Sequence, residues 1–95
     1  MEKTLVQGGR VYVDGAFEKI DLLCADGRIV GMKRQWDGWD GKRIDAQDRY
    51  VIPGFIDAHT HGAVGVDVNA ATEADLQKVA AFFATQGTTA FCASI

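Results

Sequence analysis

The sequence predicts a mixed β and α/β chain, in which a β-rich first half precedes one strand–helix–strand unit. Short aliphatic and β-branched runs separated by Asp-Gly pairs fill the first fifty residues. After residue 50 the pattern changes to an apolar strand, a glycine-rich loop, an amphipathic helix and a second apolar strand. We therefore divide the chain into residues 1–50 and residues 51–95.

Four strands are expected in the first half, at residues 4–7, 10–13, 20–25 and 28–33. Asp14-Gly15 and Asp26-Gly27 separate such runs, and Asp-Gly in this position is a strong hairpin signal. Gly8-Gly9 marks a further turn or bulge. These runs predict antiparallel hairpins.

Residues 35–41 break this pattern. They contain two Asp, two Gly and two Trp, and their apolar residues follow neither the helical period nor the strand period. We expect a surface loop in which Trp36 and Trp39 fold back onto their own domain. The alternative is a stacking platform for a sugar or a base.

The second half begins with Val51-Ile52 and Phe55-Ile56, a near-continuous apolar run expected of a strand covered on both faces. Thr72 is expected to cap a helix with acidic residues in its first turn, and Gly87 to end it. Its apolar stripe, at i, i+3, i+4 and i+7, consists of Leu76, Val79, Ala80 and Phe83. Residues 88–93 form the next strand, parallel to the first.

Composition and charge exclude several classes of protein. The hydrophobic share of 47% and the charged share of 24% are ordinary for a globular domain, which argues against a disordered tract. A net charge of −3 argues against nucleic acid or an anionic membrane as partner, and no apolar run approaches a membrane span. Cys24 and Cys92 lie in apolar stretches, so we expect buried, reduced thiols and a cytoplasmic location.

His59 and His61 are the candidate metal ligands. Residues i and i+2 of a strand share a face, so the two imidazoles can aim at one point. Catalytic zinc usually takes three protein ligands and structural zinc four, so further ligands must come from elsewhere. The alternative is a histidine pair that hydrogen-bonds locally at a loop entrance.

Asp57 shares the strand parity of the histidines, and two roles are open for it. It can orient an imidazole or cap neighbouring backbone amides. The loop with Gly62, Gly65 and Asp67 either shapes a substrate site or needs positive φ at its glycines. This loop runs several residues before its helix, so we do not expect a phosphate cradle.

The stretch from Pro53 to Gly62 resembles the first-strand signature of the amidohydrolase superfamily. The preceding residues 26–31 and 44–46 agree with this resemblance. Residues 62–69 and 87–91 are similar to N-acetylglucosamine-6-phosphate deacetylases. The resemblance covers nearly all 95 residues.

This resemblance implies a partial β-sandwich followed by the first βαβ unit of a (β/α)8 barrel, with His59 and His61 binding a divalent metal, zinc or iron. It implies hydrolysis of N-acetylglucosamine 6-phosphate to glucosamine 6-phosphate and acetate. The catalytic aspartate and the other ligands, a glutamate and two histidines, come from later strands, so no catalytic residue is assigned here and the substrate-binding residues stay unassigned. Because such a barrel needs about 250 residues, we interpret the chain as an inactive N-terminal part of a larger enzyme.

Two other readings stay open. The chain can belong to another amidohydrolase, of the dihydroorotase or N-acyl-amino-acid hydrolase type. It can also be a non-enzymatic β-rich association module with a vestigial histidine pair. For the enzyme we expect a small amino-sugar phosphate as substrate, no nucleic acid or membrane partner, and a homo-oligomer whose strands pair between chains.

Overall fold

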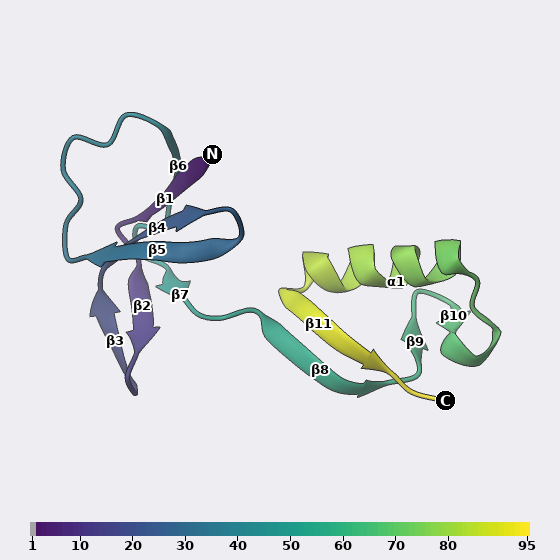
Figure 1. Ribbon diagram of the computed structural model, residues 1–95. Helices are drawn as coiled ribbons and strands as arrows, with labels where there is room; N and C mark the ends of the chain where they lie inside the picture. Colours follow the sequence, from purple (N-terminus) through teal and green to yellow (C-terminus); the bar gives the residue numbers. More distant parts are fainter. Residues whose placement is uncertain (1) are drawn as a thin grey trace. The chain divides into compact units, whose positions relative to one another are not determined.

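The computed structural model describes residues 2–95, which divide into two compact units (Figure 1). The first unit ends at Ile52 and the second spans Pro53–Ile95. The strands of the first unit are β1 (Lys3–Gln7), β2 (Arg10–Val13), β3 (Ala16–Lys19), β4 (Asp21–Ala25), β5 (Arg28–Lys33), β6 (Lys42–Asp45) and β7 (Tyr50–Val51). The four strands predicted from sequence correspond to β1, β2, β4 and β5.

The first unit is a small β-sandwich of two sheets. One sheet has the strand order β5-β4-β1-β6 and the other the order β3-β2-β7. Val11 of β2 joins Ile20 and Leu22 in one buried cluster, so apolar side chains from both sheets form the core. Burial of these side chains from water is the main stabilising term of such a unit.

Both Asp-Gly pairs form the tight turns that the sequence predicts. Asp14 and Gly15 have φ of 48° and 84°, and Asp26 and Gly27 have φ of 51° and 76°. Positive φ at both central residues is the type I′ geometry, which matches the right-handed twist of hairpin strands. The two turns therefore set the registers of the β2–β3 and β4–β5 hairpins.

The sequence did not predict β3, β6 and β7. All residues of β3 and β6 are exposed, so neither strand shows an apolar alternation. The prediction of one near-continuous run from Val51 to Ile56 was wrong. Val51 belongs to β7 and pairs with Val11 of β2, whereas the next strand starts at Phe55. Pro53 has no N–H to donate and interrupts the ladder.

The loop after β5 folds back onto the first unit, as predicted. The Trp36 ring lies over Gly31 with the Lys33 ammonium 4.6 Å from its centroid. The indole N–H of Trp39 donates to the Lys42 carbonyl oxygen at 3.0 Å. Both indoles are thus engaged by the protein itself, which leaves the stacking-platform alternative without support.

The second unit contains the predicted strand–helix–strand order. Its elements are β8 (Phe55–Thr60), β9 (Gly62–Ala63), β10 (Val66–Asp67), the 3-10 helix η1 (Val68–Ala70), α1 (Glu73–Thr85) and β11 (Thr88–Ala93). β8 and β11 pair in parallel. Thr72 and Asp75 form a reciprocal capping box at the start of α1, and Gly87 follows its end with φ of 81°.

Helix α1 packs against β11, as Figure 1 shows. Val79 is fully buried and the Phe83 ring lies 5.1 Å from that of Phe91. Phe55 is 55% exposed and Ile56 is 74% exposed, so residues 2–95 do not supply the cover on both faces that the apolar run of β8 leads us to expect in a complete sheet. One helix shields only part of a two-stranded sheet.

The two cysteines are free, but the expected burial was wrong. Cys24 is half-buried and Cys92 is exposed, and none of the six residues of β11 is fully covered by the rest of the unit. Within residues 2–95, no helix has the length and apolar character needed to cross a membrane.

Candidate metal site

His59 and His61 lie at the carboxyl end of β8, with their side chains together. Thr60 between them is buried on the opposite side of the strand. The imidazole planes cross at 83° with their centroids 4.8 Å apart. The two Nε2 atoms are 3.2 Å apart, so they face each other across the gap.

This separation suits one metal ion held by both nitrogens. At a zinc–nitrogen distance of about 2.0–2.1 Å, two nitrogens 3.2 Å apart subtend about 100° at the ion, close to the tetrahedral angle. Neutral imidazole nitrogens are good ligands for zinc, iron and nickel. The donor set and its spacing therefore fit the group that the sequence implies.

Ser94 contacts the Nδ1 atom of both imidazoles, which is the ring nitrogen that points away from the gap between the two Nε2 atoms. Its hydroxyl oxygen lies 3.1 Å from His59 Nδ1, and its carbonyl oxygen lies 3.1 Å from His61 Nδ1. Outer partners of this kind fix the orientation of ligating histidines. Sequence reasoning missed Ser94, although its position one residue past the strand paired with β8 was an available signal.

Asp57 caps the backbone rather than an imidazole. Its carboxylate accepts a hydrogen bond from the backbone N–H of His59, with nitrogen and oxygen 3.1 Å apart. The capping role that the sequence allowed is thereby confirmed. The bond lies within the last residues of β8, beside the first histidine.

The glycine-rich loop forms a tight hairpin, β9–β10, directly after the histidines. Gly62 has φ of 143°, and a Cβ there would collide with the Val66 carbonyl oxygen. The Val68 N–H donates to the His61 carbonyl oxygen at 2.9 Å. The interpretation that these glycines are needed for their backbone conformation is confirmed, and Gly65, with φ of 80°, completes the turn.

A shallow hollow of about 430 Å³ lies beside His61. It is lined by His61, Gly62, Ala63, Gly65, Val66 and Asp67. The Asp67 carboxylate is occupied in accepting from the Asn69 N–H. The hollow is therefore formed by the β9–β10 hairpin and one of the two histidines.

The histidine pair has no third ligand in the part of the chain that the structure describes. Across residues 2–95, no group of three or more His, Cys, Asp or Glu side chains comes together. The pair can hold a metal with half a tetrahedral shell. Full coordination needs water or other protein groups.

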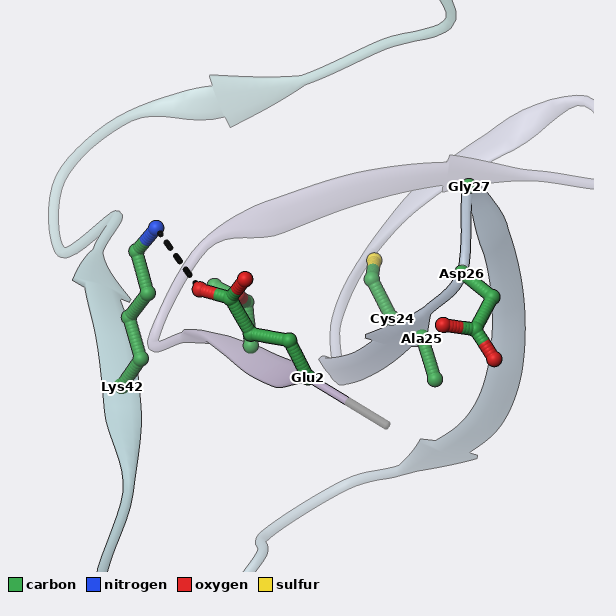
Figure 2. Close-up of a pocket in the computed structure, with 7 residues that line it drawn as sticks. Glu2, Cys24, Ala25, Asp26, Gly27 and Lys42 are labelled. Atoms are coloured by element: carbon green, nitrogen blue, oxygen red, sulfur yellow. Dashed lines mark hydrogen bonds and ion pairs between the residues drawn. The ribbon is translucent and has the colours of Figure 1, made fainter.

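A second hollow, of about 330 Å³, lies in the first unit at one end of β4 (Figure 2). Its lining includes Cys24, Asp26 and an ion pair between Lys42 and Glu2, 3.5 Å apart. Both members of this pair are largely exposed, so the pair contributes little. Neither histidine lines this hollow, which makes it a poor candidate for the chemistry described above.

This chain shares its β-sandwich unit and its following βαβ unit with solved enzymes of the hydrolase class. The profile of the amidohydrolase family matches residues 42–94, more than half of the chain. This chain belongs to the amidohydrolase family.

Curated relatives span several amidohydrolase activities. Dihydropyrimidinase 2 of Caenorhabditis briggsae is 45% identical over 58 residues, 60% of this chain and 11% of that protein. A dihydroorotase of Caldanaerobacter subterraneus subsp. tengcongensis is 47% identical over 47 residues, 50% of this chain and 11% of the relative. The N-acetylglucosamine-6-phosphate deacetylase of Lysinibacillus sphaericus is 27% identical over 84 residues, 88% of this chain and 22% of the relative.

Solved structures reproduce the fold. The N-acetyl-D-glucosamine-6-phosphate deacetylase of Mycobacterium smegmatis, in complex with N-acetyl-D-glucosamine-6-phosphate, superimposes with a TM-score of 0.78 at 23% identity, covering 100% of this chain and 25% of its own. A prolidase complexed with N-methylphosphonate-L-proline superimposes with a TM-score of 0.69 at 26% identity. The match covers 94% of this chain and 25% of the prolidase chain. This chain thus spans between about a tenth and a quarter of the length of these relatives.

Proposed function

We propose that this chain supplies the first two metal ligands, His59 and His61, of an enzyme that deacetylates N-acetylglucosamine 6-phosphate to glucosamine 6-phosphate and acetate. The observation that carries the metal site is the 3.2 Å separation of the two Nε2 atoms. The substrate is supported by the extent of the likeness to deacetylases, which covers 88% of this chain in one relative and all of it in one structure.

A divalent ion, zinc or iron, would polarise the amide carbonyl and lower the pKa of water. The residues of this chain contribute position rather than proton transfer. His59 and His61 hold the ion, Asp57 fixes the strand end by its bond to the His59 amide, and the β9–β10 hairpin forms one wall beside His61. The base and the remaining ligands are assigned to parts of the enzyme beyond these residues.

The β-rich unit is proposed to be part of the sandwich of the whole enzyme, and the second unit to open its (β/α)8 barrel. The sequence placed this boundary after residue 50. The pairing of Val51 with β2 supports a boundary at Pro53. We also propose a cytoplasmic homo-oligomer, for which the two free thiols and the exposed apolar residues of β8 are the support.

The second candidate function is ring opening of a cyclic amide, as in dihydroorotases. The 47% identity to one dihydroorotase favours it, although the match covers only half of this chain. The two candidates share the histidine pair and differ in the substrate, so only an assay with both substrates separates them.

The substrate test uses the full-length enzyme with N-acetylglucosamine 6-phosphate and, separately, dihydroorotate. We expect acetate release from the first and no reaction of the second. The His59→Ala variant should lose most of the acetate release, whereas Lys78→Ala, an exposed change on α1, should not. Turnover of dihydroorotate without acetate release would replace this proposal by the second candidate.

The metal test is a calorimetric zinc titration of the chain itself. We expect weak binding in the parent and in Lys78→Ala, and no signal in His59→Ala, because one imidazole alone holds zinc poorly. Tight binding that survives His59→Ala would show that other residues are the ligands.

A further inference from the structure

Ser94 and the histidine pair form a closed ring of polar contacts. The Ser94 hydroxyl oxygen meets His59 Nδ1, His59 Nε2 meets His61 Nε2, and His61 Nδ1 meets the Ser94 carbonyl oxygen. The three separations are 3.1, 3.2 and 3.1 Å. One residue therefore contacts both imidazoles, through its side chain and through its backbone.

The chemistry of the atoms determines where the protons lie when no metal is bound. The Ser94 carbonyl oxygen only accepts, so His61 Nδ1 must carry a proton, and neutral His61 then has a lone pair at Nε2. As a hydrogen bond, the 3.2 Å contact between the two Nε2 atoms then has His59 Nε2 as its donor. His59 Nδ1 is then an acceptor, and the Ser94 hydroxyl donates to it.

A metal ion requires a different arrangement, because it needs the lone pairs of both Nε2 atoms. His61 already presents one. His59 must move its proton from Nε2 to Nδ1, after which the Ser94 hydroxyl oxygen has to accept rather than donate. A hydroxyl can do both, since it has one donor and two acceptor sites. The hydroxyl can then donate its hydrogen bond to the Cys92 carbonyl oxygen, 3.5 Å from the Ser94 hydroxyl oxygen.

We propose that Ser94 is a positioning residue whose hydroxyl reverses its hydrogen bond with His59 when a divalent cation binds. The inference rests on the metal site of the proposed function. The proton at His59 Nε2 passes to water and Nδ1 takes one from water, so the pair releases no net proton. A carboxylate or carbonyl in place of the hydroxyl could support only the loaded state.

The first test is a nitrogen-15 NMR spectrum of the histidine rings in the 95-residue chain, without metal and with zinc. Without metal we expect His59 protonated at Nε2 and His61 at Nδ1. Zinc should change His59 to the Nδ1 form and leave the tautomer of His61 as it was. A His59 that already carries its proton at Nδ1 without metal would overturn the proposal.

The second test compares Ser94→Ala with Ser94→Thr. The alanine variant loses the hydroxyl but keeps the carbonyl. Metal-free His59 then keeps its donation to His61 but loses the hydrogen bond at Nδ1, so a minor share of the Nδ1-protonated form should appear while His61 does not change. Its zinc affinity should fall by about tenfold, the lower end of the range for outer partners of metal ligands. The threonine variant should restore both properties.

The His61 signal serves as a control for folding in the same spectrum. Equal changes at both histidines in Ser94→Ala would mean a general loss of structure and would overturn the specific role. A parent-like His59 in that variant would overturn it as well. Failure of the parent chain to bind zinc would refute the metal site together with the switch, whereas normal zinc binding without a tautomer change at His59 would refute the switch alone.

Discussion

The backbone N–H of Ser94 donates a hydrogen bond to the carbonyl oxygen of Thr60, with nitrogen and oxygen 2.8 Å apart. The bond continues the parallel ladder between β8 and β11, in which Ala93 pairs with Thr60 after a register shift that follows Phe91. Thr60 is the residue between the two histidines. This pairing places Ser94 beside both of them.

Substituting Ser94 by proline should weaken zinc binding more than substituting it by alanine. Both variants lack the hydroxyl, but only proline lacks the N–H that bonds to Thr60. Loss of one such bond, worth about 1 kcal/mol, should lower the affinity by a further factor of roughly five. Parallel calorimetric titrations measure the difference, and equal affinities would show that the pairing does not position Ser94.

Gly62→Ala should destabilise the second unit by about 2–3 kcal/mol, because the added Cβ meets the Val66 carbonyl oxygen and φ is positive. Gly65→Ala is the matched control: its φ is also positive, but nothing lies within 4 Å of the new Cβ. The control should cost about 1 kcal/mol. Urea unfolding followed by circular dichroism measures both, and similar losses would contradict the predicted collision.

Asp21→Ala should destabilise the first unit by about 2–4 kcal/mol. The buried carboxylate accepts from the backbone N–H groups of Gly8 and Trp36, each at 2.8 Å, and the variant leaves both donors without that partner. Asp45→Ala removes one exposed bond, to the Gln47 N–H, and should cost less than about 1 kcal/mol. Urea denaturation monitored by tryptophan fluorescence reports the difference, and a smaller loss in Asp21→Ala than in Asp45→Ala would refute it.

The chain should self-associate. Its parallel sheet has two strands in the described residues, and β8 exposes Phe55 and Ile56, so strand edges and apolar side chains are available to a second copy. Ile56→Lys should shift a light-scattering dilution series toward the monomer, and Asn69→Lys, with the same added charge outside the strands, should not. A parent chain that stays a 10.3 kDa monomer throughout the series would contradict the prediction.

The 95-residue chain should release no acetate from N-acetylglucosamine 6-phosphate above background, with or without added zinc or iron. It supplies two imidazoles, while the catalytic base and substrate pocket are assigned to other parts of the enzyme. An enzymatic acetate assay on purified chain measures this. Metal-dependent turnover that disappears in His61→Ala would show that the chain contains a complete site.

Local features of the fold could be predicted because neighbouring residues determine them. The two Asp-Gly turns and the capping box of Thr72 and Asp75 need contacts over no more than three residues. The parallel pair β8–β11 followed from two apolar runs around one amphipathic helix. Strands β6 and β7 could not be predicted, since each pairs in parallel with a strand about forty residues earlier in the chain and carries no apolar period of its own.

The candidate ligands follow from the amino-acid pattern alone, because the period of a strand places His59 and His61 on one face whatever surrounds them. The partner that orients the two imidazoles, in contrast, depends on how distant parts of the chain fold together. Ser94 is 33 and 35 residues away along the chain, and its contacts with the imidazoles depend on the register of β8 against β11 and on the shift within it. That register is set by side-chain packing and backbone pairing over the whole unit, which no single residue pattern encodes.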